Sequence, residues 1–353
     1  NGSEMYTMHK KAQIEAGVNW IFIIVAGAII LLFFASVAAW YKSNQETKIS
    51  GQVVVKLDSM FTSAIESPRT AKSVTIPDLP IHFTCDNDCN KYGCPSYFSG
   101  GAVSRDSGTE VVFSMANLEA NNLISWALNF KIPYKVTNFL YLTNDQIRYI
   151  IIYDTSTEDL FEAVNDVLSE NPHLNLEAFF DDGSLEFEDY NDDFVRVVSL
   201  IQNTYQEDDF EEFFSDSDFD FVEVSGNEIS GSVFYGSELT GVQYYGIPML
   251  IGAIFSENSE FYKCNVNKAL LLSSYVSYVY EKRTEWIESN LPITPEDKSY
   301  CIGYYALDVT NAFNTIGGMS DIEALGAGDL SSAIITIEKN DNLAIINDCP
   351  RLY

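Results

Sequence analysis

The most apolar stretch of the chain runs from Trp20 to Tyr41 and contains 22 residues without a charge. As a helix it is about 33 Å long at about 1.5 Å per residue, which matches a hydrocarbon layer of about 30 Å. Trp20, Trp40 and Tyr41 stand at its ends, where aromatic rings favour the headgroup layer. The pattern predicts a transmembrane helix over residues 17–41 after a leader of residues 1–16. A cleaved secretory signal peptide, the alternative, has a shorter apolar core and a small-residue cleavage site after it.

Beyond this stretch, apolar positions recur three or four residues apart, which is the spacing of one helix face. These positions are Ile49, Val53, Leu57, Met60, Phe61, Ala64 and Ile65. Only Gly51 opposes a helix here, at a cost of about 1 kcal/mol. Residues 42–67 are therefore predicted to continue the membrane helix outward, with or without a break, as an amphipathic stalk.

Residues 68–255 contain short stretches rich in β-branched and aromatic residues, which predict strands. We expect strands at Val74–Thr84, Glu110–Ser114, Ser125–Phe130, Val136–Leu142, Ile147–Tyr153, Leu174–Phe180 and Val195–Ile201, a hairpin at Phe221–Tyr235, and a buried strand or core element at Val242–Phe255. Thr157–Ser169 has the apolar spacing of a helix, with Thr157 as its cap. It lies between two of the strands, and this order predicts a βαβ unit in a mixed β-sheet.

Residues 256–353 show helical spacing at Val266–Trp286, Ile302–Ile316 and Leu330–Ile337. Helices joined by short loops form an antiparallel bundle or a layer on a sheet. The predicted fold class is therefore α+β or α/β. It combines an N-terminal transmembrane helix with an amphipathic stalk, a mixed β-sheet with a βαβ unit, and a C-terminal helical layer.

The chain has six cysteines, three early and three late: Cys85, Cys89, Cys94, Cys264, Cys301 and Cys349. They are predicted to form disulfides in an oxidising compartment. If all six pair, at least one bridge must link the early group to the late group, but the connectivity stays open. A zinc site is the alternative for the early group, because His82 with three cysteines is a valid tetrahedral set. Free thiols are the third possibility.

The charge balance is strongly acidic, with 20 basic and 51 acidic residues and a net charge of −31. This excludes nucleic acid as a plausible partner, because phosphate contacts need lysine and arginine. Between Asp154 and Glu223 there are 23 acidic residues and one basic residue, Arg196. Aromatic residues interleave the acidic ones, so we expect a solvated acidic face or loop rather than a disordered tail.

Three alternating carboxylates in this segment have the spacing of a calcium loop: Asp216, Asp218 and Asp220. The EF-hand pattern also needs glycine at its sixth position and glutamate at its twelfth, where this chain has Phe221 and Asn227. The specific motif is therefore not met, and calcium is kept only as the one cofactor to test.

Catalytic motifs do not stand out in the sequence. It contains no nucleophile elbow, dinucleotide-binding glycine motif, P-loop or zinc-protease motif. Only His82 and His173 follow the membrane helix, and both are expected at the surface. Since carboxylates are abundant, the catalytic alternative is a carboxylate-dependent hydrolase, without a residue assigned to it.

Lysines flank the membrane helix evenly, because Lys10 and Lys11 precede it and Lys42 and Lys48 follow it. The short N-terminal flank and the later concentration of cysteine and acid favour a cytoplasmic N-terminus. The C-terminal part is then extracellular, as the ectodomain of a single-pass cell-membrane protein.

The run from Lys10 to Glu15, KKAQIE, followed by the apolar stretch, resembles the class III signal peptides of archaeal type IV pilin-like proteins. The resemblance implies cleavage between Ala12 and Gln13 and packing of the helix in a filament. It differs from that pattern at two positions. Ala12 stands where glycine is usual, and Glu15 falls at the third mature position rather than the fifth. As a whole, the chain resembles uncharacterised single-pass surface proteins of archaea, which implies no activity.

These observations predict a membrane-anchored cell-surface protein that binds a ligand or supports a larger assembly. Its expected partners are the membrane and, as a further possibility, other surface proteins or a filament. Two alternatives stay open. One is a pilin-like filament subunit processed before Gln13, and the other is a membrane-tethered carboxylate-dependent hydrolase.

Overall fold

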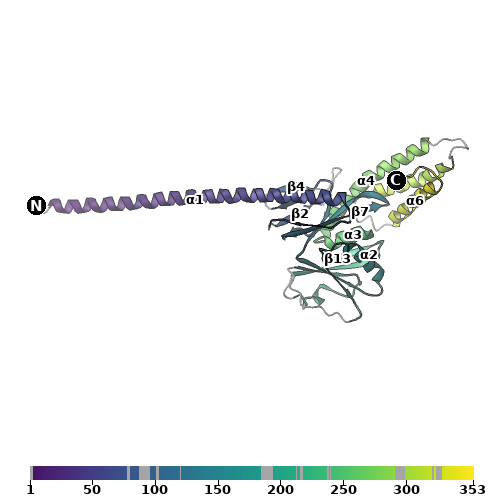
Figure 1. The fold of residues 1–353 in the computed structure, drawn as a ribbon, viewed down its shortest axis with the longest axis horizontal. Helices are drawn as coiled ribbons and strands as arrows, with labels where there is room; N and C mark the ends of the chain where they lie inside the picture. The colour runs from purple at the N-terminus through teal and green to yellow at the C-terminus, as the bar shows by residue number, and fades with distance from the viewer. Residues whose placement is uncertain are drawn as a thin grey trace.

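The computed structural model describes residues 3–77, 80–86, 96–100, 103–119, 121–183, 194–211, 213–214, 218–236, 238, 240–290, 299–319, 322 and 328–353. The fold is mixed α and β, as predicted. A long N-terminal helix leads into sheets that contain both parallel and antiparallel strands, and helices form the C-terminal part (Figure 1).

The N-terminal helix α1 runs without interruption through 64 residues, Ser3–Glu66. Its first part extends away from the rest of the molecule (Figure 1). Within the described residues, this is the one helix long and apolar enough to cross a membrane. Its large apolar side chains are exposed over that part, including Phe22, Leu31 and Trp40.

The second part of α1 lies in the core. Val53, Leu57 and Phe61 are fully buried, and the helix packs against the strands of two sheets. The predicted apolar stripe is therefore confirmed, and the helix passes Gly51 without a break. The stalk prediction differs in one respect. From Ser50 onward the helix belongs to the folded domain, so only residues 42–49 connect the apolar part to it.

Two four-stranded sheets surround this end of α1. One has the order β1-β7-β8-β5, formed by Lys72–Thr75, Asn122–Ile132, Tyr134–Asn144 and Val111–Phe113. The other has the order β4-β3-β2-β6, formed by Ser104–Asp106, Ser96–Gly100, Ile81–Cys85 and Asn117–Leu118. The predicted single strand Val74–Thr84 is therefore wrong. It divides into β1 and β2 in different sheets, and Pro77 and Pro80 between them lack the amide hydrogen that a ladder needs.

The third sheet has six strands in the order β10-β9-β11-β12-β13-β14. They are Asn175–Phe180, Ile147–Tyr153, Phe194–Ser199, Asp218–Gly226, Ser230–Tyr235 and Val242–Tyr245. The first four are parallel, and helix α2 (Glu158–Leu168) connects β9 to β10, which confirms the βαβ unit. The hairpin of β12 and β13 is also confirmed.

The two faces of this sheet are covered differently. Tyr149 and Ile151 share a core with α2 and with helix α3 (Gly246–Phe255). Ile150 and Ile152 point the other way and pack with Phe210 and Phe214 from the connection that follows β11. The stretch predicted as one core element at Val242–Phe255 thus divides into an edge strand, β14, and the buried helix α3.

The C-terminal helices form the predicted layer. Helix α4 (Ser259–Asn290) packs on α5 (Leu307–Gly317), and α5 packs on α6 (Gly328–Ile346). The second predicted helix begins with a 3-10 turn, η2 (Ser299–Tyr305), rather than an α-helical one. Among the described residues, two disulfides brace this part of the chain, Cys85–Cys264 and Cys301–Cys349. The first joins the early and late cysteines, as the sequence required if all six pair.

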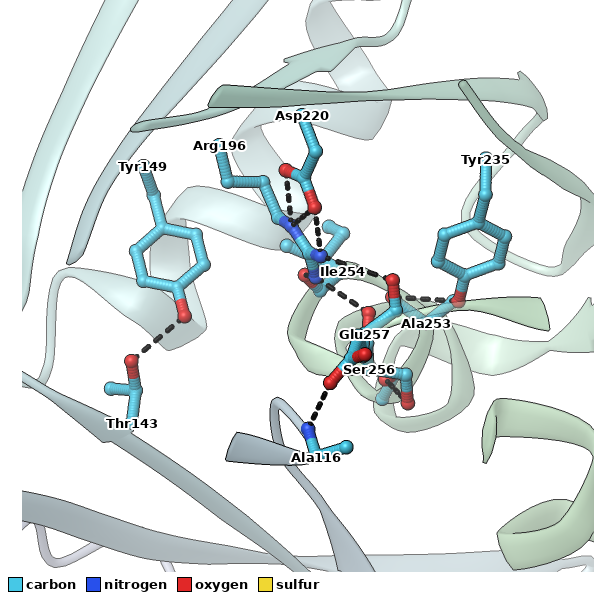
Figure 2. Close-up of polar contacts among 11 residues, drawn as sticks. Ala116, Thr143, Tyr149, Arg196, Asp220, Tyr235, Ala253, Ile254, Ser256 and Glu257 are labelled. Carbon is cyan, nitrogen blue, oxygen red and sulfur yellow. Dashed lines mark hydrogen bonds and ion pairs between the residues drawn. The ribbon is translucent and has the colours of Figure 1, made fainter. Parts of the chain in front are cut away.

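A buried arginine connects the six-stranded sheet to α3. Arg196 of β11 has no exposed surface, and its guanidinium forms a double hydrogen bond with the carboxylate of Asp220 on β12 (Figure 2). Its Nη1 also donates to the carbonyl oxygens of Ile254 at 2.7 Å and Ser256 at 2.6 Å. These carbonyls lie at the C-terminus of α3, where the helix leaves acceptors without partners and carries partial negative charge.

Burial alone would lower the pKa of Arg196, but the neighbouring Asp220 carboxylate outweighs that effect and raises it. The arginine is therefore charged in the core. Tyr235 adds a parallel contact, because its hydroxyl donates to the carbonyl of Ala253 at 2.8 Å (Figure 2).

We expect Asp220→Asn to lower the free energy of unfolding by about 3–5 kcal/mol, because it leaves the Arg196 charge buried without a counter-ion. Denaturant unfolding of the detergent-solubilised chain, followed by near-UV circular dichroism, measures this. Glu260→Gln is the control. It removes an exposed pair with Lys263 and is expected to cost less than about 1 kcal/mol. Equal losses in the two variants would contradict the assignment.

Candidate functional site

A cavity of about 450 Å³ opens beside β12 and β13. Small-molecule sites in proteins have volumes of roughly 300–1,000 Å³, so the size fits a ligand. Four carboxylates and three aromatic rings are among the side chains that line it: Glu207, Asp208, Glu223, Glu238, Tyr205, Phe221 and Phe234. No lysine, arginine or histidine is among the lining residues described.

The topology of the six-stranded sheet explains the place of the cavity. The connection after β9 passes through α2 on one face, and the connection after β11 covers the other face. Adjacent parallel strands whose connections leave on opposite faces create a crevice at their carboxyl ends, and α/β sheets commonly bind ligands there. The residues from Gln202 to Asp208 follow β11 and form one wall of the cavity beside this crevice.

Backbone and side-chain contacts fix the carboxylates of the cavity. The backbone amide of Asn203 donates to Oε2 of Glu223 at 3.2 Å. Burial raises the pKa of Glu223, and this hydrogen bond opposes the shift only in part. Ser259 at the start of α4 donates to Oε1 of Glu238 at 3.0 Å.

Gly236 provides space for a third carboxylate. A Cβ atom at this position would lie 3.0 Å from Oε2 of Glu207, and its φ of +50° lies in the left-handed region that favours glycine. Its amide donates to the carbonyl of Phe221 at 2.7 Å, which continues the pairing of β12 with β13 by one residue. The glycine therefore lets the Glu207 side chain approach the backbone at the cavity wall.

Tyr205 joins the cavity to the crevice. Its hydroxyl donates to Oδ2 of Asp181, directly after β10, at 2.7 Å. Burial raises the pKa of Tyr205, and the charges of Asp181, Asp209 and Asp154 raise it further. Asp154, Asp181 and Asp209, which follow β9, β10 and β11 in the chain, therefore all lie near the ring of Tyr205.

The zinc site that was the alternative for His82 and the three early cysteines loses one of its four ligands to a disulfide. Cys85 is bonded to Cys264, so its sulfur is not a thiolate ligand. His82 is exposed, and its Nδ1 lies 2.5 Å from Oδ1 of Asn117. Cys89 and Cys94 lie outside the described residues. In the described part of the chain, no group of three or more His, Cys, Asp and Glu side chains is arranged to hold a metal ion.

Of the three aspartates with calcium-loop spacing, the two that the structure describes have different surroundings. Asp218 begins β12 and is exposed, and Asp220 is the partner of Arg196, while Asp216 lies outside the described residues. The sequence pattern at Asp218 and Asp220 therefore reflects alternation along a strand rather than a loop. The acidic side chains that the structure describes around them are mostly solvated, and Phe210 and Phe214 anchor the segment on the sheet, which agrees with the predicted acidic face.

Three further predictions concern positions away from the cavity. Ala12 and Gln13 lie within the helical backbone of α1. His173 is an exposed residue in the turn before β10, and its amide donates to Oδ1 of Asn171. Thr157 does occupy the N-cap of α2, but its hydroxyl accepts from the amide of Asp154 instead of from the helix.

The cavity does not follow from the sequence, because its wall is built from two separate stretches, residues 202–208 and 221–238. The signal that was present is the alternation of aromatic and acidic residues in this region. Comparison with models of known protein families gave no match, and neither the curated proteins nor the solved structures gave one.

We expect Glu223→Gln to be more stable than the wild type at about pH 7 and similar to it at about pH 4. The raised pKa means that the folded state holds the Glu223 proton more tightly, so its contribution to stability falls as pH rises above the ordinary glutamate pKa. Unfolding curves across this pH range measure the difference. Exposed Glu162 of α2 provides the control substitution to glutamine, and the same pH trend there would contradict the explanation.

Proposed function

We propose that this protein is a membrane-anchored binding protein that takes a small organic cation in the cavity beside β12 and β13. The observation that carries the proposal is the lining of the cavity, where carboxylates and aromatic rings occur together without a basic residue among those described. Such a lining offers an ammonium or guanidinium group both counter-charges and ring faces.

The charge of the whole chain supports the same ligand class. A net charge of −31 creates a negative field that attracts cations and speeds their association. Phe221 and Phe234 add apolar wall, so an organic cation with a short alkyl part fits the cavity better than a bare metal ion. The carboxylates of the protein determine the charge of the ligand, and the aromatic rings determine its shape.

Agmatine is a suitable probe, because it joins a guanidinium and an amine through a short alkyl chain. We expect the double variant Glu223→Gln/Glu238→Gln to bind it at least about tenfold more weakly, since each charged hydrogen bond contributes roughly 1.5–3 kcal/mol. Binding is also expected to weaken as the pH falls through the raised pKa of Glu223, because a protonated Glu223 offers no counter-charge. Isothermal titration calorimetry with the detergent-solubilised chain measures both effects.

The matched control is Glu158→Gln/Glu162→Gln, which removes the same charge from α2 and leaves every residue of the cavity in place. If both double variants bind equally weakly, the attraction is diffuse and the cavity is not the site. Magnesium ions provide the second comparison, and tighter binding of magnesium than of agmatine would also contradict the proposal.

The anchoring part of the proposal is supported by the exposed apolar surface of α1 from Phe22 to Tyr41. We expect the full chain to stay with membranes in alkaline carbonate. A chain that begins at Asn44 should be released, because the remaining part of α1 is polar or packed in the core. Release of the full chain would contradict the anchor.

A pilin-like subunit is a second candidate, and the continuity of α1 favours it. One helix that projects as an apolar rod and then enters the folded domain is the shape such a subunit needs. The intact mass of the chain from native membranes distinguishes the candidates. A mature N-terminus at Gln13 supports the filament, and an unprocessed leader supports the fixed anchor. The carboxylate-dependent hydrolase, in contrast, would use the same cavity, where Glu223 has a raised pKa beside other carboxylates.

A further inference from the structure

A buried lysine lies away from the cavity, between α4 and the sheet of β2, β3 and β4. Lys268 is only 3% exposed and stands one helical turn after Cys264. Its Nζ donates to the hydroxyl oxygen of Ser96 at 2.6 Å and to that of Ser107 at 3.0 Å. Burial of an ammonium group is costly, so a lysine in this place needs a reason.

The two serines meet because their strands are neighbours. Ser96 begins β3 and Ser107 follows β4, and the amide of Ser107 donates to the carbonyl of Ser96 at 2.9 Å. Their hydroxyl oxygens are 2.5 Å apart. Two hydroxyls and one amine therefore form a closed triangle of hydrogen bonds, built from residues as far apart in sequence as Ser96 and Lys268.

The surroundings of Lys268 make its neutral form accessible at mildly alkaline pH. Burial lowers its pKa to about 8, and the nearby carboxylates of Asp106 and Glu110 only partly oppose this. Glu110 in turn faces Asp58 of α1 and Arg105 of β4, and its own pKa is raised by burial. A neutral lysine at hydrogen-bond distance from a serine hydroxyl is a base that can take the serine proton.

We propose that Ser96 is the nucleophile, and Lys268 the general base, of a serine–lysine acyl-transfer centre in which Ser107 orients the amine. Serine with lysine is an established variant of the serine and histidine pair. The substrate class is an ester or amide carbonyl. This inference does not depend on the proposed cation site, which uses other residues.

The chemical step balances within this group. Oγ of Ser96 attacks the carbonyl carbon and its proton passes to Nζ of Lys268, so an O–C bond forms. The bond from carbon to the alcohol or amine then breaks, and Lys268 returns the proton to that leaving group. Water hydrolyses the acyl-serine with Lys268 as base again, and a carboxylic acid and free Ser96 result.

Access limits the substrate. A crevice of about 10 Å³ lies beside Ser96 and Ser107, which is room for a single water molecule. Tyr97 also lines it and is 46% exposed, so the crevice meets the surface there. Because the crevice admits only one water molecule, the probe for this site must be small.

The test is modification of the folded full chain by methanesulfonyl fluoride, mapped by peptide mass spectrometry. In this reaction the S–F bond breaks, fluoride leaves and a bond forms from sulfur to the serine oxygen. We expect the label on Ser96, with a rate that rises with pH to a plateau above about pH 8, as Lys268 loses its proton. Exposed Ser230, which begins β13, should stay unlabelled.

Variants separate catalysis from a structural role. Lys268→Met keeps an apolar side chain of similar length and is expected to slow labelling by about 100-fold or more, the usual contribution of a general base. Ser96→Ala should abolish the label, and Ser107→Ala should slow it but leave it on Ser96. If Lys268→Met does not fold, the Ser96→Ala and Ser107→Ala variants and the pH profile of the wild type still test the proposal. An unlabelled Ser96 in the folded wild type would overturn the proposal and leave Lys268 a structural residue.

Discussion

The charge of Arg196 in the core constrains much of this fold. A guanidinium can be buried only if a carboxylate neutralises it and acceptors surround it, and both come from elsewhere in the chain. Asp220 supplies the counter-charge from the next parallel strand, and the end of α3 supplies the carbonyls. Because α3 is buried and followed directly by α4, the position of the C-terminal layer depends on the same group. The arginine gives hydrogen-bond donors to the carbonyls at the helix end, and those carbonyls give the guanidinium its acceptors.

Local pattern was sufficient for the elements whose partners are close in sequence. The four-residue spacing from Val53 to Phe61 predicted the buried face of α1, and the runs around Thr157 predicted β9, α2 and β10 nearly to the residue. The residues next to a side chain in sequence do not identify a partner that lies far away in the chain. Asp220 looked like one of three alternating aspartates, and only the parallel pairing of β11 with β12 makes it the partner of Arg196.

The same limit applies to the sites. Glu223 and Glu238 belong to a common cavity because a hairpin and the connection after β11 fold over one another. Ser96 and Lys268 meet because α4 packs on a sheet formed far earlier in the chain. Composition did indicate the general result, since the described acidic residues of this segment lie mostly at the surface while Phe210, Phe214 and Phe221 between them are buried. It could not indicate which carboxylates share a space.

The unbroken course of α1 has a mechanical consequence. A helix of 64 residues is about 96 Å long, and this one has no joint between its exposed apolar part and the core. The folded domain is then rigidly attached to the end of a straight helix. Transmembrane helices tilt by about 20° on average, and any tilt or rotation of this helix would turn the whole domain by the same angle. If α1 spans a bilayer as proposed, the lipids and helices around it there would set the orientation of the cavity.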